Sequence, residues 1–197
     1  MDWRVYHSIN TFVAHHSWLG RTFHVVETYG TILIGVAAVC LWLLARPGGS
    51  QKWKLAAGSA LGAAALGLLV NKIISSAWHR DRPFAHHPAH VWGPHKTDAS
   101  FPSDHASAAF GIAVAVALID PLVGAFFIVL AVLIAVGRVV VGEHYPGDVI
   151  AGAAIGTVSA LVVIRFARPV IALLVRFIER ATDPVLALAW RRRVSDQ

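Results

Sequence analysis

The sequence predicts an all-α membrane protein: a polytopic helical bundle with about five transmembrane helices and an interfacial helix at each end. Hydrophobic residues make up 56% of the 197 positions and charged residues only 14%, and the mean hydropathy of +0.61 exceeds that of an ordinary soluble domain. The apolar residues form long uncharged runs, not the short alternating pattern of a β-barrel. Backbone groups in hydrocarbon must be paired internally, so these runs are expected to cross the membrane as helices.

Five uncharged runs provide the expected spans. With their flanks they approach the ~20 residues that a helix needs to cross the hydrocarbon core. The runs are 28–45, 55–70, 106–119, 121–137 and 149–164. A cleavable signal peptide is not expected before the first run, because that segment contains histidines and an acid and has no small-residue cleavage site. Residues 1–197 are interpreted as one membrane domain, because no internal repeat occurs and no loop is long enough for a second domain.

The two ends of the chain predict interfacial helices. The N-terminal segment, about residues 2–20, places Tyr6, Ile9, Val13 and His16 at helical spacing, which is typical of an amphipathic helix lying in the membrane surface. The C-terminal segment, about residues 169–190, is expected to lie at the interface and not to form a sixth span, because its charged residues would be costly in hydrocarbon. It contains Arg176, Glu179, Arg180 and Asp183, followed by Pro184, which is expected to break the helix.

Charge asymmetry predicts the topology. Five crossings place the polar loop that ends near Ser100 on the same side as the loop 141–147. The opposite side carries a basic group, Arg46, Lys52, Lys54, Arg165 and Arg168. The positive-inside rule assigns this group to the cytoplasm of a plasma (inner) membrane protein, and the two loops to the extracytoplasmic face. The cations that oppose this assignment unless they serve a site are Arg80, Arg82, Lys96 and Arg138.

Composition also argues against two other kinds of protein. The formal charge of +6 could indicate nucleic acid as a partner, but the arginines are spread among hydrophobic spans, which fits anionic lipid head groups better. The single cysteine, Cys40, lies in an apolar run, so no disulfide framework is expected. The expected partners are therefore the bilayer and a lipid, not nucleic acid.

Arg138 is the first candidate for a functional residue, because a guanidinium that faced lipid near the end of an apolar run would cost at least a few kcal/mol. Its planar set of donors suits phosphate oxygens, and Arg80 and Arg82 in the preceding polar loop could converge on the same anion. A single arginine could instead extend its side chain to the interface. Three arginines beside histidines on one side favour a phosphate site.

His144 and Asp148 form the second candidate group. Pro146 and Gly147 between them predict a turn that opens the fifth span, with Asp148 in its first turn, where the helix dipole favours a carboxylate. Asp148 could then hydrogen-bond one imidazole nitrogen of His144 and leave the other free to attack phosphorus. The alternative is an N-capping aspartate beside an unrelated histidine. A proton donor for the leaving oxygen is also needed, and the imidazole of His105 can supply one.

The start of the third span is the third candidate. Ser103 precedes His105 at the expected helix N-terminus, where free backbone N–H groups and a hydroxyl form a natural seat for phosphate. The same residues are equally typical of a capping sequence in which Ser103 or Asp104 is the cap. The Asp104 carboxylate would repel a bound anion unless an arginine pairs with it.

Together these residues resemble the type 2 phosphatidic acid phosphatase superfamily. Its signature comprises a Lys segment followed by Arg-Pro, a Pro-Ser-Gly-His segment, and Ser-Arg followed after five residues by His and after three more by Asp. The resemblance covers residues 72–148 and, through the helix pattern, most of the chain. The third motif is the most specific, because Arg138, His144 and Asp148 keep the family spacing.

The resemblance implies a role for each matching residue. His144 would be the nucleophile, Asp148 its partner and His105 the general acid. Phosphate would be bound by Arg82, Ser103 and Arg138. The reaction would pass through a phosphohistidine intermediate, with protein cations in place of a metal and with no other cofactor.

Three departures from the family pattern affect the expected contacts. Gly137 stands where the family usually has serine, so one hydroxyl contact is missing. Asp104 replaces the glycine of the second motif. Lys72 lies farther before Arg82 than the usual lysine, so Arg80 is expected to take over part of its phosphate-binding role.

The forms Arg-Asp-Arg-Pro-Phe and Phe-Pro-Ser-Asp-His look most like the bacterial undecaprenyl-diphosphate phosphatases of this superfamily, which act at the outer face of the plasma membrane. This resemblance implies that the substrate is a polyprenyl diphosphate, hydrolysed to the monophosphate so that the lipid carrier returns to cell-wall synthesis.

Other interpretations of the same residues remain. A phosphatidylglycerophosphate or phosphatidic acid phosphatase could use the same site, a transporter could bind a lipid phosphate without hydrolysis, and a non-catalytic assembly partner would tolerate loss of both histidines. A crowded loop could bind zinc through His86, His87, His90 and His95, although no cysteines or ligands at metal-like helical spacing accompany them.

Overall fold

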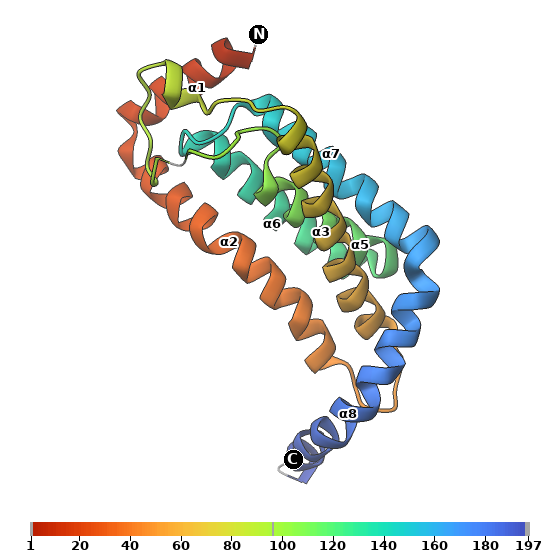
Figure 1. The fold of residues 1–197 in the computed structure, drawn as a ribbon. Coiled ribbons are helices and arrows are strands. Elements are labelled where there is room, and N and C mark those ends of the chain that lie inside the picture. Colours follow the sequence, from red (N-terminus) through yellow and green to blue (C-terminus); the bar gives the residue numbers. More distant parts are fainter. Residues whose placement is uncertain (1, 96, 196–197) are drawn as a thin grey trace.

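The computed structural model describes residues 2–95 and 97–195, with side chains up to Leu188, so that Lys96 lies outside the described residues. The regular elements of this described part are all helices (Figure 1). They are α1 (Asp2–His15), α2 (Ser17–Leu44), α3 (Lys52–Ala77), α4 (Pro83–His86), α5 (Asp104–Ile119), α6 (Pro121–Val140), α7 (Pro146–Val162), the π-helical turn Val163–Ala167 and α8 (Arg168–Ser195). The predicted fold class is confirmed.

The expected spans correspond one to one with α2, α3, α5, α6 and α7. By length and composition, four helices are long enough to cross a membrane: α2, α3, α6 and the continuous helix Pro146–Leu188. The shorter apolar helix α5 is the remaining expected span. α2 begins at Ser17, well before the uncharged run, and its acidic residue Glu27 is paired inside the protein with Arg138.

α5 lies at the centre of the bundle, in contact with α3, α6 and α7. Its buried face is made largely of small residues such as Ala106, Ala109 and Ala113. On α7, a Cβ at Gly152 or Gly156 would overlap the backbone of α5. Glycines four residues apart let two membrane helices approach closely, so α7 brings its first turn beside the start of α5.

The two ends of the bundle have different chemistry. At one end, Lys52 contacts Asp120 at 3.0 Å, and the indole nitrogen of Trp53 donates to the same carboxylate at 3.1 Å. The loops that carry Arg82 and His144 lie at the other end. The loops therefore alternate between the two ends as the five-span interpretation requires.

α1 and α8 run across opposite ends of the bundle (Figure 1). α1 is amphipathic, as expected, but its polar side packs on other loops. The Tyr6 hydroxyl donates to the carbonyl of Gly142 at 3.0 Å, and the Asn10 side chain donates to the carbonyl of His90 at 2.7 Å while accepting from its N–H at 3.0 Å. α1 is therefore tied to the loops of the functional end.

The C-terminal segment is helical, but it is continuous with the fifth span, and the break expected at Pro184 does not occur in the described residues. The chain continues from α7 through the π-helical turn into α8, and Pro184 lies inside the helix. The charges that argued against a crossing form ion pairs: the buried Lys54 ammonium contacts Glu179 at 3.1 Å and Asp183 at 2.6 Å. These pairs fasten α8 to the start of α3.

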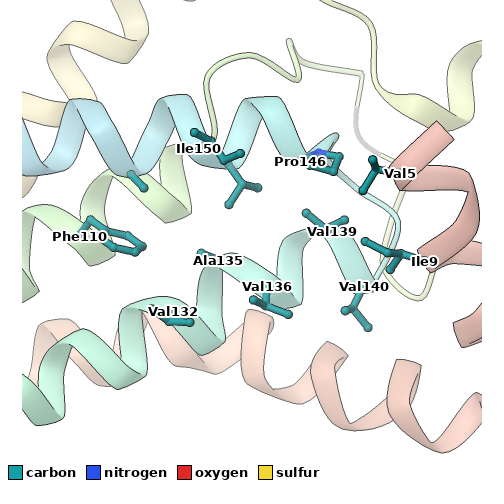
Figure 2. Close-up of a pocket in the computed structure, with 12 residues that line it drawn as sticks. Val5, Ile9, Phe110, Val132, Ala135, Val136, Val139, Val140, Pro146 and Ile150 are labelled. Atoms are coloured by element: carbon teal, nitrogen blue, oxygen red, sulfur yellow. The ribbon is translucent and has the colours of Figure 1, made fainter. Parts of the chain in front are cut away.

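An apolar groove of about 330 Å³ lies between α6 and α7, with Phe110 of α5 toward one end and Val5 and Ile9 of α1 at the other (Figure 2). Its rim includes the exposed side chains of Val136 and Ile150. Such a surface in a membrane-spanning bundle suits hydrocarbon chains. The groove shares no lining residue, among those described, with the polar pocket at the functional end.

Candidate active site

The loop between α6 and α7 positions the histidine of the third motif. Gly142 adopts a φ of +87°, a conformation that side chains disfavour, and a Cβ there would overlap the carbonyl oxygen of His90. At the start of α7, the Asp148 carboxylate accepts from the N–H of Tyr145 at 3.0 Å. This local turn fixes His144 between Arg138 and Asp148, and the imidazole is buried.

The two nitrogens of His144 have different partners. Nδ1 lies 2.8 Å from the carbonyl oxygen of Ser100, which can only accept, so Nδ1 carries the proton. In a neutral imidazole Nε2 is then unprotonated. Nε2 lies 3.3 Å from Nη1 of Arg82 and 3.2 Å from Nη2 of Arg138. The unprotonated nitrogen of the candidate nucleophile thus faces two guanidinium groups.

Electrostatics keep this nucleophile neutral. Burial lowers the pKa of His144 to about 4, and the positive charges of Arg138 and Arg82 act in the same direction, against an opposing contribution from Asp148. At neutral pH the imidazole is therefore uncharged, which is the form that can attack phosphorus.

Asp148 supports His144 through an intermediate residue. Its Oδ2 lies 3.7 Å from Nδ1 of His144, too far for the direct hydrogen bond that the sequence predicted. The Ser100 hydroxyl instead donates to Asp148, while the Ser100 carbonyl holds the imidazole. Ser100 is fully buried, so it links the acid to the ring in a fixed geometry.

A small polar pocket opens in front of His144. Its volume is about 50 Å³, and it contains the side chains of the general-acid candidate His105 and of Arg82, Arg138 and His144. The N-terminus of α5 lies at the same place, and the Ser103 hydroxyl, fully buried, has no hydrogen-bond partner among the described residues. Free N–H groups, two guanidiniums and two imidazoles therefore surround one cavity, an arrangement suited to a phosphate group.

Comparison with known proteins agrees with this geometry. Residues 56–171 match the model of the PAP2 superfamily, which is more than half of the chain. The chain belongs to the PAP2 superfamily. The resemblance carried by the three motifs is thereby confirmed.

Individual relatives point in the same direction. Undecaprenyl-diphosphatase BcrC of Bacillus subtilis is 29% identical over 182 residues, covering 91% of this chain and 92% of the relative. Bacitracin transport permease protein BcrC of Bacillus licheniformis is 31% identical over 156 residues, covering 79% and 75%. The crystal structure of Aquifex aeolicus LpxE shares the fold, with a TM-score of 0.69 at 22% identity over 83% of this chain and 94% of that one. This PAP2 protein is a multi-pass membrane phosphatase.

Some of the predicted phosphate ligands of this PAP2 protein, namely Ser103, Arg80 and Lys72, are not among the described residues that line the pocket. Arg80 does not line the pocket among the described residues. It contacts Asp148 at 2.7 Å and Asp2 at 2.8 Å, and it stacks on the Tyr145 ring. The expected convergence of Arg80 with Arg82 and Arg138 is therefore wrong: Arg80 binds the carboxylate behind the nucleophile.

Lys72 and Asp104 lie near the same end with different surroundings. Lys72 is exposed on α3 and is not among the described residues that line the pocket. Asp104 does line the pocket, and its carboxylate accepts from the Asn71 side chain at 2.8 Å. Among the described residues, the partner of the Asp104 carboxylate is thus an amide of α3 and not an arginine.

Sequence reasoning missed the carboxylates that surround the two arginines. Arg82 donates to Asp98 at 2.9 Å, while Arg138 donates to Glu27 and Glu143. Glu143 immediately precedes His144, and Glu27 is an acid inside an apolar helix. The position of Glu27 inside an apolar helix was the signal that the sequence offered, because ionisable residues in membrane spans are rarely without a function.

The loop histidines occupy separate environments. His86 contacts Asp81 at 2.8 Å, His87 stacks on Trp3 and His95 meets the edge of Phe84. In the described part of the chain, no group of three His, Cys, Asp or Glu residues is arranged to hold a metal ion.

Proposed function

We propose that this PAP2 protein hydrolyses the terminal phosphate of a polyprenyl diphosphate, of the undecaprenyl type, to the monophosphate through a phosphohistidine intermediate on His144. The observation that carries the proposal is the unprotonated Nε2 of His144, which faces Arg82 and Arg138 in a pocket that also contains His105.

In the first step, Nε2 attacks the terminal phosphorus in line, and the bond from phosphorus to the bridging oxygen breaks. His105 donates a proton to the departing lipid monophosphate. Arg82, Arg138, the Ser103 hydroxyl and the N–H groups at the start of α5 bind the non-bridging oxygens, whose charge spreads in the transition state. The Ser100 carbonyl and, through it, Asp148 support the imidazolium that forms on His144.

In the second step, water attacks the phosphorus of phosphohistidine while His105, now unprotonated, accepts a proton from that water. The bond between phosphorus and Nε2 breaks, and inorganic phosphate leaves. His144 and His105 return to their starting protonation states. The protein cations supply the positive charge throughout, so the step sequence requires no metal ion.

The substrate class is proposed from the membrane setting and from the relatives. The site lies at the end of a bundle of apolar helices, where a lipid phosphate in the bilayer surface can reach it. One relative over almost the whole chain is an undecaprenyl-diphosphatase. From the positive-inside rule we infer that the site lies on the extracytoplasmic face of the plasma membrane, where hydrolysis of the diphosphate to the monophosphate would return the carrier to cell-wall synthesis.

The experiment is a phosphate-release assay on purified protein in detergent, with polyprenyl diphosphate, phosphatidylglycerophosphate and phosphatidic acid compared side by side. We expect the highest kcat/KM on the diphosphate, retained in excess chelator. Higher kcat/KM on either phospholipid would replace the proposed substrate. Loss of activity on chelation, restored by a divalent cation, would contradict the metal-free steps.

The nucleophile is tested in the same assay. His144→Ala is expected to lower kcat by about 1,000-fold or more and to abolish acid-labile phosphoprotein trapped from labelled substrate. His15→Ala, which changes an exposed histidine of α1, is the matched control and should behave as wild type. Turnover that survives in His144→Ala would refute the mechanism, and binding without turnover in the wild type would favour a lipid-phosphate transporter.

A further inference from the structure

We propose that two buried carboxylates, Glu27 and Glu143, are positioning residues that hold the Arg138 and Arg82 guanidiniums against the nucleophile. The inference rests on the proposed function, because it concerns how the phosphate-binding arginines of that same site are oriented. It assigns a role to one residue of α2 and to one residue of the loop between α6 and α7.

Glu27 connects α2 to the site. It lies within a membrane-spanning helix and is only 4% exposed, and its Oε2 accepts from Nη1 of Arg138. A carboxylate in such a position is costly unless a cation compensates it. Gly137 of α6 lies against this part of α2, since a Cβ there would be in van der Waals contact with Phe23 and Glu27. Glu27 therefore pairs with the arginine across the contact between α2 and α6.

Glu143 connects the two arginines to each other. It is fully buried, and its Oε2 accepts from Nη2 of Arg138 and, at 3.3 Å, from Nη1 of Arg82. Arg82 Nη1 also donates to the Glu143 backbone carbonyl at 3.1 Å. These two nitrogens are the ones that lie beside Nε2 of His144. One carboxylate thus sets the spacing of both guanidiniums relative to the nucleophile.

Both carboxylates lie behind the arginines as seen from the pocket. Neither residue is among the described residues that line the pocket. Both carboxylates lie near Gly93, since a Cβ placed there would be 2.8 Å from Oε1 of Glu143 and 3.7 Å from Oε1 of Glu27. The buried Nε of Arg138 has no hydrogen-bond partner in the described part of the chain. The carboxylates balance the buried cations without occupying the phosphate position.

The main test is Glu27→Gln, which keeps the size of the side chain and removes its charge. We expect kcat on polyprenyl diphosphate to fall by about 10- to 100-fold, as for partners that orient other ligating groups, with a much smaller change in KM. Glu179→Gln is the matched control, because Glu179 pairs with Lys54 at the opposite end of the bundle. The control should keep the wild-type kcat.

A double-mutant cycle separates positioning from a general structural role. If Glu27 acts through Arg138, the variant that combines Glu27→Gln with Arg138→Lys should be no slower than Arg138→Lys alone. Independent losses would multiply and would overturn the proposal. An unchanged kcat in Glu27→Gln would overturn it as well.

Two further measurements keep the outcomes distinct. If Glu27→Gln does not fold, as judged by size-exclusion chromatography, the same cycle is run with Glu143→Gln and decides by the same criteria. Failure of the proposed function would show itself separately, as turnover that survives in His144→Ala. A wild-type kcat in Glu27→Gln together with an inactive His144→Ala would refute only the positioning role.

Discussion

At the residue scale, the site depends on ion pairs between arginines and carboxylates. The arginines are conspicuous in the sequence, but nothing in the sequence indicates which carboxylates pair with them. Arg138 and His144 stand out in the sequence because they interrupt or follow an apolar run. Glu27 lies far from both along the chain and meets Arg138 only because α2 packs against α6. A cation near hydrocarbon is therefore predictable from sequence, but its partner depends on which helices are neighbours.

The protonation of His144 leads to a prediction about stability and pH. The ordinary pKa of histidine is about 6.5 in an unfolded chain, whereas burial lowers it to about 4 in the folded protein. Between these values the unfolded chain binds more protons, so the free energy of unfolding rises with pH across this window and falls on acidification. Thermal unfolding from pH 7 to pH 4 should show a steeper loss in wild type than in His144→Gln. Parallel curves would contradict the lowered pKa.

Arg80 shows the limit of motif reasoning at this scale. It sits two residues before Arg82, and adjacency in the chain suggested one shared anion. In the structure the two guanidiniums point to different carboxylates, since Arg80 contacts Asp148 and Asp2 while Arg82 contacts Asp98. The direction of a long side chain is decided by the charges that folding brings near it.

At the element scale, the loop between α6 and α7 is held in place by hydrogen bonds from two other segments. Tyr6 of α1 binds the Gly142 carbonyl, and Trp92 donates its backbone N–H to the Val141 carbonyl at 3.1 Å. The helical periodicity of α1 was predictable from its apolar positions. The role of α1 in holding this loop in place was not predictable, because Tyr6 and Asn10 form hydrogen bonds with segments that are distant in sequence.

The contacts that hold the loop between α6 and α7 predict different results for two glycines with positive φ. Gly142 and Gly48 have φ of +87° and +70°, but a Cβ at Gly142 would overlap the His90 carbonyl whereas nothing lies within 4 Å at Gly48. Gly48→Ala should cost about 1–3 kcal/mol of backbone strain alone. Gly142→Ala should cost more and should also lower kcat, as measured by unfolding midpoints and phosphate release. Equal effects of the two substitutions would show that the loop can move away freely.

At the scale of the whole molecule, the chain is a bundle with the candidate active site at one end and ion pairs that join its helices at the other. The five runs of uncharged residues predicted the crossing helices because hydrocarbon admits few other structures. The continuity of α7 and α8 was not predictable, since the charges that seemed to interrupt it are compensated by Lys54 of another helix. The sequence shows that a charged residue in an apolar segment is energetically costly, but it does not show which residue of opposite charge compensates it.

The topology is testable by cysteine labelling in intact cells with a Cys40→Ala background. Ser50→Cys lies in the exposed turn between α2 and α3, and Thr97→Cys lies in the exposed loop before α5. A membrane-impermeant thiol reagent should label Thr97→Cys from outside, and Ser50→Cys only after the membrane is opened. Labelling of both from the same side would refute the alternation of spans. Gly93 is unsuitable as a probe, because a side chain there would press on Glu143.

The sequence by itself determined that the protein is a helical membrane bundle and that His144, His105, Arg82 and Arg138 are its chemical candidates. Both conclusions depend on local properties: the length of apolar runs, and motif spacing within one turn or loop. Only the tertiary structure decided that Ser100 stands between His144 and Asp148, that Arg80 contacts Asp148 and Asp2, and that Glu27 and Glu143 contact the arginines. These facts depend on which distant segments become neighbours, because in a buried site each charge takes the partner that helix packing places within reach.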